Sequence, residues 1–257
     1  AFTGNKFEFR MLGPAASVAN PNIVLNTAVA EALDQFAKEL DGVAPEDMEH
    51  AVHELIKRAI KKHKRVIFNG NGYTDEWIEE AEKRGLYNLK STPDALPMWI
   101  AQKNIDLFTK HSIFTSEELH SRYEIWLENY SKTINIEALT MVDMAKKQYI
   151  PAVMEYTRTL ADTVLAVKSA GADATVQTTV LKSISEKLTE AQAAETSLED
   201  KLAEAAGIED PKKLAFFYKD VVHTAMDDLR APVDALEMMV DKKVWPVPTY
   251  GDLIFEV

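Results

Sequence analysis

The sequence predicts a mainly α-helical protein, with one β-strand near its N-terminus and an antiparallel bundle of long helices toward its C-terminus. Apolar residues recur every three or four positions over most of the chain, which is the spacing of a helix that covers a core. Residues 5–12, "NKFEFRML", instead alternate charged and apolar side chains as a strand does. Three long amphipathic stretches separated by short turns indicate the bundle.

The predicted strand places Lys6, Glu8 and Arg10 on one face and apolar side chains on the other. Three charges on one face are costly to bury unless they are paired. They could lie on an exposed face. They could also line a polar cavity in which Glu8 binds a metal ion and the two cations hold phosphate oxygens. A carboxylate, a divalent cation, phosphate and arginine are the components of phosphoryl transfer. The pattern alone does not decide between these interpretations.

A single strand cannot satisfy its own backbone hydrogen bonds, so its partner strands must come from elsewhere. The chain starts at Ala1, inside this strand-like sequence. We therefore expect the chain to be the C-terminal piece of a longer protein.

The first predicted helices follow a loop with the sequence "GPAASVANPN". Asn22 is the expected N-cap of a helix from about Ile23 to Leu40, and Gly42 fits the stop at its C-terminus. A second helix is expected to open at Pro45 and to continue to about Lys62. Its acidic residues lie near the positive end of the helix dipole and its basic cluster near the negative end.

Three further helices are predicted, two of them from capping signals and one from its apolar pattern. Thr74 is the expected N-cap of a helix over residues 75–84 that closes on Gly85. Residues 98–110 have a helical pattern. Thr115 or Ser116 begins a capping box, in which the cap and the residue three positions later bond each other's backbone N–H groups.

The long helices of the predicted bundle cover residues 121–167, about 175–206 and about 211–243. Pro151 predicts a kink or break in the first of them, and Pro232 predicts a bend in the third. The C-terminal sequence "VWPVPTYGDLIFEV" is expected to pack on the bundle as an extended strap.

Composition excludes several classes of protein. The 46% apolar content supports a core, and no segment approaches the ~18 uninterrupted apolar residues of a membrane helix. The net charge of -12 argues against nucleic-acid binding and fits a soluble cytoplasmic protein. The absence of cysteine excludes disulfides, thiolate chemistry and cysteine-based zinc sites.

Three other motifs have simpler structural explanations. His50 and His53 share a helix face and could bind a metal, but without a third ligand a surface pair is favoured. Glu117 and His120 form half of a di-iron-type motif whose second half does not occur in the chain. The sequence "NGNGY" lacks the lysine and hydroxyl residue of a P-loop, so a tight turn is favoured over phosphate contact.

A family resemblance lies in these residues. "KFEFR", followed by "ANPN" and a helix rich in alanine and leucine, resembles the end of the glutamine synthetase catalytic domain. The segments "NPNIVLNT", "RVIFNGNGYTDEWIEEAEKRGL", "NYSKTINIEALTMVDMAKK" and "WPVPTYGDLIF" are similar to the type III glutamine synthetases. The resemblance covers nearly the whole chain and is weakest over residues 170–213, where the sequence is a generic helix.

The resemblance implies specific roles for the charged strand. Glu8 matches a glutamate that binds one of the active-site divalent metals, Mg²⁺ or Mn²⁺. Arg10 matches an arginine that contacts the transferring phosphoryl group. Lys6 matches an arginine that contacts the nucleotide, ATP, and lysine keeps the charge but lacks the planar fork of arginine. The other site residues of the family lie upstream, so the chain alone is expected to be inactive.

The family reaction joins glutamate and ammonia with ATP hydrolysis, through a γ-glutamyl phosphate. The resemblance then implies that residues 1–42 end the catalytic α/β domain. Residues 43–257 would form a type III-specific helical region that serves assembly, because the family forms dodecamers of two hexameric rings. The alternative is a non-catalytic helical interaction or oligomerisation module, in which the charged strand is only an exposed edge.

Overall fold

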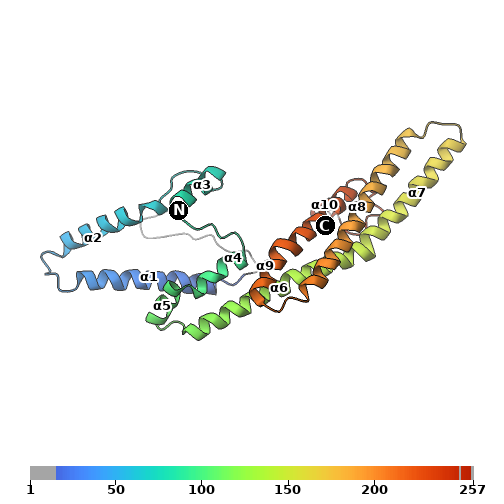
Figure 1. Cartoon of the computed structure of the whole chain (residues 1–257). Coiled ribbons are helices and arrows are strands. Elements are labelled where there is room, and N and C mark those ends of the chain that lie inside the picture. Colours follow the sequence, from blue (N-terminus) through green and yellow to red (C-terminus); the bar gives the residue numbers. More distant parts are fainter. Residues whose placement is uncertain (1–15, 249, 256–257) are drawn as a thin grey trace. The chain divides into compact units, whose positions relative to one another are not determined.

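A computed structural model of the 257-residue chain describes residues 16–248 and 250–255. Every regular element in these ranges is helical (Figure 1). The mainly α-helical prediction is therefore confirmed for this part of the chain, whereas the predicted strand at residues 5–12 lies outside the described residues. None of the described helices combines the length and the apolar character needed to cross a membrane.

The chain divides into two compact units. The first unit consists of Ala1–Lys90 and Pro97–Arg122, and the second consists of Ser91–Leu96 and Tyr123–Val257. Helix α6 (Ser116–Met144) begins in the first unit and continues in the second.

Helix α1 (Ala19–Leu40) opens the described part of the first unit. It starts earlier than predicted, and Asn22 is not its N-cap. The N–H of Asn22 instead donates to the carbonyl of Val18 at 3.2 Å, inside the first turn. Pro21 is tolerated there because N–H groups in the first turn have no helical partner in any case. The predicted stop is confirmed, since Gly42 has a φ of 79°, which glycine adopts readily.

Helices α2 (Met48–His63) and α3 (Asp75–Lys83) follow, with the short 3-10 helix η1 (Lys64–Val66) between them. Pro45 does not open α2, because it lies in a turn that precedes the helix. The α3 boundaries agree with the prediction. Thr74 occupies the N-cap position, and Gly85 has a φ of 69° just after the helix.

The helix predicted over residues 98–110 is interrupted. The 3-10 helix η2 (Leu96–Ile100) is followed by α5 (Gln102–Lys110), and Ala101 between them has extended backbone angles. Trp99 packs on Phe108 with ring centroids 5.4 Å apart, and Phe108 packs on Phe114 at 5.6 Å. These aromatic contacts join the segments on either side of the break.

The capping box at the start of α6 is confirmed. The backbone N–H of Thr115 donates to Oε2 of Glu118 at 2.8 Å, and the N–H of Glu118 donates to Oγ1 of Thr115 at 3.2 Å. Two N–H groups that the helix cannot satisfy are thereby paired reciprocally.

The second unit contains long helices that lie along one another (Figure 1). Helix α6 continues through a π-helical turn, η3 (Ala145–Tyr149), into α7 (Ile150–Ser169), so regular α-helix is interrupted just before Pro151, as predicted. Helix α8 (Thr175–Ala205) returns after a short turn and packs against α7 and α10. This packing agrees with the predicted antiparallel bundle.

The third long stretch is divided into α9 (Pro211–Phe217), a second π-helical turn η4 (Tyr218–Val222) and α10 (His223–Glu237). It ends six residues before the predicted boundary at residue 243. Beyond it, Trp245 is buried and lies 5.1 Å from Tyr149 between ring centroids. The prediction of an extended strap is therefore wrong in part, because the C-terminal segment also forms the short helix α11 (Tyr250–Phe255).

The core of the second unit has two layers of buried apolar side chains from the long helices. One layer consists of Ala138, Val142, Ala145, Ile150, Leu198, Ala205, Tyr218, Val222, Ala225, Met226 and Leu229. The other consists of Val153, Ile184, Ala191, Leu236, Val240 and Trp245. Small residues such as Ala191 and Ala205 allow the helix backbones to approach closely.

Candidate functional site

The charged strand predicted as the site lies outside the described residues. Lys6, Glu8 and Arg10 therefore keep the roles predicted from the sequence, and the structure adds no geometry for them. The described residues contain several polar clusters and an apolar pocket, and the geometry of each indicates what this part of the chain can do.

Within residues 16–248 and 250–255, the other candidate metal motifs have no third ligand nearby. His50 and His53 are both exposed on α2. His120 on α6 is exposed, and its Nδ1 forms a hydrogen bond with the carbonyl of Ser116 at 2.8 Å. Among the described residues, no group of three or more histidine and acidic side chains is placed to hold a metal ion.

The "NGNGY" segment is a tight turn, as the sequence favours. The side chain of Asn71 accepts a hydrogen bond from the N–H of Tyr73 at 3.1 Å, and the Thr74 hydroxyl donates to the Asn71 carbonyl at 3.3 Å. A Cβ atom on Gly70 would lie 2.7 Å from Cζ of Phe68, so a larger residue there would require that ring to shift. The hydrogen bonds of this turn are therefore made between residues of the turn itself.

A cluster of charged side chains joins α1 to the end of α5. We call Glu31, Asp34, Lys110 and His111 the α1–α5 cluster. Lys110 Nζ lies 2.6 Å from Oε2 of Glu31 and 2.7 Å from Oδ2 of Asp34, and His111 Nε2 lies 2.7 Å from the same Glu31 oxygen. Its carboxylates come from one helix and its lysine and imidazole from another, so the cluster fixes how these helices pack.

Glu31, Asp34 and Lys110 of the α1–α5 cluster are charged at neutral pH. The hydrogen bond from Lys110 lowers the pKa of Glu31 to about 2 and the pKa of Asp34 to about 2. The same carboxylates raise the pKa of Lys110, with Asp34 as the larger cause. A carboxylate held this far below neutral is a poor general base at pH 7, so the cluster is suited to packing rather than to proton transfer.

A buried carboxylate lies between α8 and the π-helical turn η3. Glu195 is only 1% exposed, and Gln192 donates a hydrogen bond to its Oε2 at 2.8 Å. Lys146 Nζ is 3.4 Å from its Oε1, an ion-pair contact without hydrogen-bond geometry, and 2.6 Å from Oε1 of Glu199. This contact could not be predicted, because the sequence of residues 170–213 is that of a generic helix.

A third charged contact ties α4 (Thr92–Ala95) to η4. Lys219 Nζ lies 2.9 Å from Oδ1 of Asp94, and the Ser91 hydroxyl donates to Oδ2 of the same carboxylate at 2.6 Å. The hydrogen bond from Ser91, followed by the one from Lys219, lowers the pKa of Asp94. The contact joins segments 125 positions apart in the sequence.

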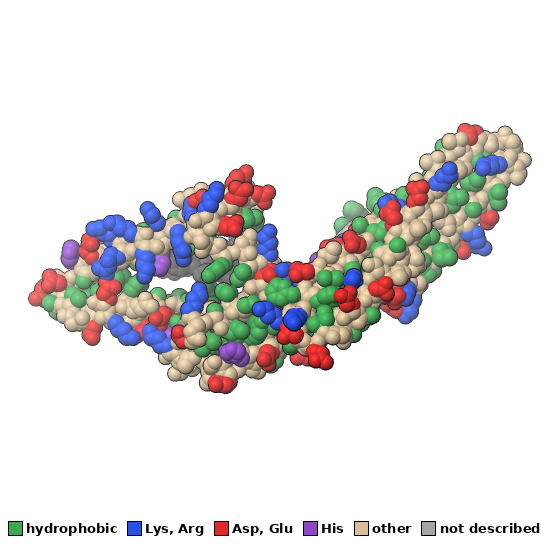
Figure 2. Space-filling view, viewed as in Figure 1, with side chains coloured by type: hydrophobic (Ala, Val, Ile, Leu, Met, Phe, Trp, Pro, Cys, Tyr) green, Lys and Arg blue, Asp and Glu red, His purple; other side chains and the backbone are tan. Residues whose placement is uncertain are grey.

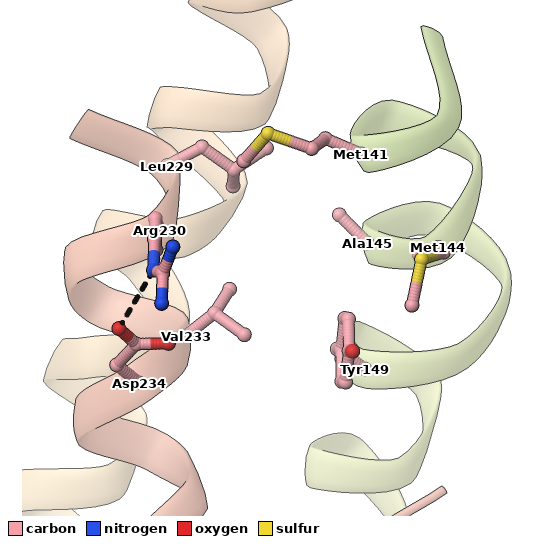
Figure 3. A pocket seen from close by; sticks show the side chains of 8 residues that line it. All are labelled: Met141, Met144, Ala145, Tyr149, Leu229, Arg230, Val233 and Asp234. Carbon is pink, nitrogen blue, oxygen red and sulfur yellow. Dashed lines mark hydrogen bonds and ion pairs between the residues drawn. The ribbon is translucent and has the colours of Figure 1, made fainter. Parts of the chain in front are cut away.

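The second unit contains a pocket between η3 and α10, which we call the η3–α10 pocket (Figure 3). It has a volume of about 300 Å³ and is lined by Met141, Met144, Ala145, Tyr149, Leu229, Arg230, Val233 and Asp234. Val233 points across it toward the helix that carries Tyr149 (Figure 3). Arg230 Nε lies 3.1 Å from Oδ2 of Asp234 at one edge. This lining suits an apolar group rather than a reacting one.

Comparison with known proteins identifies the family. A family model described as the glutamine synthetase C-terminal domain matches residues 51–168, from α2 to α7. The glutamine synthetase of Butyrivibrio fibrisolvens is 41% identical to the chain over 264 aligned positions, which cover 100% of this chain and 37% of that protein. The type-3 glutamine synthetase of Dictyostelium discoideum is 36% identical over 99% of this chain and 36% of that protein.

The chain belongs to the glutamine synthetase family. A glutamine synthetase of Bacteroides fragilis is also similar, with 29% identity over 99% of this chain and 36% of that protein. The chain thus spans somewhat more than a third of the length of the relatives it matches. The resemblance seen in the sequence motifs is confirmed.

Proposed function

We propose that this chain is the C-terminal portion of a glutamate–ammonia ligase, which makes glutamine with ATP through a γ-glutamyl phosphate. Residues 1–42 would end its catalytic domain, and residues 43–257 would form a helical region. The observation that carries the proposal is similarity along the whole chain, including the segment with "KFEFR", to proteins named glutamine synthetase.

Glu8 would contribute a carboxylate oxygen to a Mg²⁺ or Mn²⁺ ion. Hard divalent cations prefer such oxygens, and one carboxylate does not complete a coordination shell. The remaining ligands would come from the part of the protein that lies outside this chain. The ion, when bound, neutralises phosphate charge during phosphoryl transfer.

The two cations of the strand would contact phosphate oxygens on either side of Glu8. Arg10 has a planar guanidinium that can donate two parallel hydrogen bonds to a phosphoryl group as charge develops on its oxygens. Lys6 would contact the nucleotide through a single compact charge, with less geometric specificity than arginine. In the predicted strand, the alternation of side chains would put both cations on the face that carries Glu8.

The proposed test uses the full-length enzyme. Glu8→Ala is expected to abolish glutamate- and ammonia-dependent phosphate release and to weaken Mn²⁺ binding measured by titration calorimetry. Glu79→Ala removes an equal charge from an exposed position of α3 and is the matched control, with unchanged turnover expected. Near-normal turnover of the Glu8→Ala enzyme would rule out the metal-ligand role.

We propose assembly as the work of the helical region, in a homo-oligomer of two hexameric rings. Large apolar side chains are exposed on the second unit, and such residues favour protein contacts. They are Ile125, Ile136, Leu139, Met154, Leu165, Val176, Val180, Met238, Leu253, Ile254 and Phe255. A full-length protein that assembles but forms no glutamine would instead support the non-catalytic interaction module.

A further inference from the structure

The η3–α10 pocket has no part in the proposed function. Its volume of about 300 Å³ is at the lower end of the range of roughly 300–1,000 Å³ that ligand pockets have. One wall is the π-helical turn η3 itself, since its first and last residues, Ala145 and Tyr149, both line the pocket. Turns of this kind occur frequently at functional sites. The size restricts a ligand to a small molecule.

The interior of the pocket is apolar and adaptable. Met141 and Leu229 come from opposite walls, and Val233 points across the pocket (Figure 3). Ala145 presents only a methyl group, which leaves room in front of η3. Thioether side chains such as Met141 and Met144 change conformation readily and pack against apolar groups of different shapes. The interior therefore suits a branched or aromatic apolar side chain.

The edge of the pocket carries charges of both signs. Arg230 Nε lies 3.1 Å from Oδ2 of Asp234, and these side chains are 68 and 58% exposed, so a ligand can reach both. Figure 2 shows the same mixture over the second unit, where basic and acidic side chains stand beside exposed apolar ones. An anion at the edge would meet the Asp234 carboxylate, and a cation would meet the Arg230 guanidinium. A zwitterion satisfies both, because one group only donates hydrogen bonds and the other only accepts them.

Tyr149 supplies a further donor on the wall opposite α10. Its hydroxyl forms no hydrogen bond with another residue of the described ranges 16–248 and 250–255. Burial raises the pKa of Tyr149, and the charges of Glu237 and Asp234 raise it further. The hydroxyl therefore stays protonated at neutral pH and can donate to a ligand carboxylate.

We propose that the η3–α10 pocket binds an apolar α-amino acid, whose side chain enters the apolar interior while its two charged groups stay at the edge. The ligand carboxylate contacts Arg230, its ammonium group contacts Asp234, and Tyr149 is a further donor. This binding goes beyond the proposed function and depends only on the packing of the second unit.

The test is titration calorimetry of the full-length protein with L-leucine and L-phenylalanine. Glutamate is kept in excess, so that an active site for glutamate is already filled. We expect one binding site per chain. The deaminated and decarboxylated analogues of leucine, 4-methylpentanoate and 3-methylbutylamine, each lack one charged group and should bind at least about tenfold more weakly than leucine, because a hydrogen bond to a charged group is lost.

Three variants locate the site. Asp234→Asn removes the partner of the ammonium group and should weaken leucine binding at least about tenfold. Val233→Phe fills the pocket and should abolish binding. Asp227→Asn is the matched control, because Asp227 is 69% exposed on the same helix, pairs with His223 and does not line the pocket. Its affinity for leucine should be unchanged.

Amide exchange of α10 peptides checks that the variants keep their packing, since Val233 contacts both core layers. If Val233→Phe loosens the bundle, Asp234→Asn decides, because it alters only an exposed side chain. Absence of binding at millimolar concentrations of both amino acids would overturn the proposal. Binding that Asp234→Asn leaves unchanged would mean that the ligand binds elsewhere, and it would also overturn the proposal. Equal affinity for leucine and its singly charged analogues would refute recognition of a zwitterion.

Discussion

Replacement of Leu198 by alanine tests whether this face of α8 is buried in the core of the second unit. Leu198 is fully buried, in the layer that also contains Val142, Tyr218 and Leu229. The change removes three carbon atoms from the core, which costs about 2 to 2.5 kcal/mol at ~0.8 kcal/mol per buried methylene. The cavity left behind adds to this cost, so the total is expected to lie in the range of about 2–5 kcal/mol.

The assay is amide hydrogen exchange of the full-length protein, followed by mass spectrometry of α8 peptides. A loss of 2 kcal/mol corresponds to about a 30-fold loss of protection, where exchange reports opening of the bundle. Asp162→Ala is the control, because Asp162 is exposed on α7 and should change stability by less than about 0.5 kcal/mol. If both variants lose protection equally, or neither does, Leu198 is not in a bundle core and the packing described above is incorrect.

Three further outcomes are expected of the full-length protein. Thr115→Ala should cost about 1 kcal/mol and speed amide exchange in the first turn of α6, whereas Thr140→Ala, near the C-terminal end of that helix, should not affect that turn. The pKa of Glu31 is lowered from 4.5 to about 2, so the stability that its contact with Lys110 provides is complete above pH 4.5 and is lost as the pH falls toward 2. In the Lys110→Met protein the carboxyl should titrate closer to 4.5 by NMR, and an unchanged midpoint would disprove the assigned cause. Leu139→Asp should lower the mass in solution measured by sedimentation if the exposed face of α6 serves assembly, and an unchanged mass would exclude that face.

Local signals in the sequence located most helices and several of their ends. Gly42 and Gly85 mark stops because the backbone after a helix commonly takes a positive φ, which glycine adopts at little cost. The capping box of Thr115 and Glu118 is equally local, since both partners lie within one turn. Such features depend on neighbouring residues only, so they can be read without a tertiary structure.

Other features depend on packing and could not be predicted. The break at Ala101 accompanies aromatic contacts between Trp99, Phe108 and Phe114 across it. The π-helical turns η3 and η4 each contain one residue more than an α-helical turn, and no residue type in the sequence marks where they occur. The buried position of Glu195 likewise depends on Lys146, which lies on another helix.

The sequence by itself determined the family, through motifs along the whole chain, and the predicted roles of Lys6, Glu8 and Arg10 depend on that match. It also predicted the helix from about Ile23 to Leu40, because helical periodicity fixes which side chains lie together. Only the tertiary structure decided that Glu31 and Asp34 of α1 contact Lys110 of α5. Glu31 and Lys110 are 79 positions apart, and periodicity contains no information about which distant segment will cover a given face.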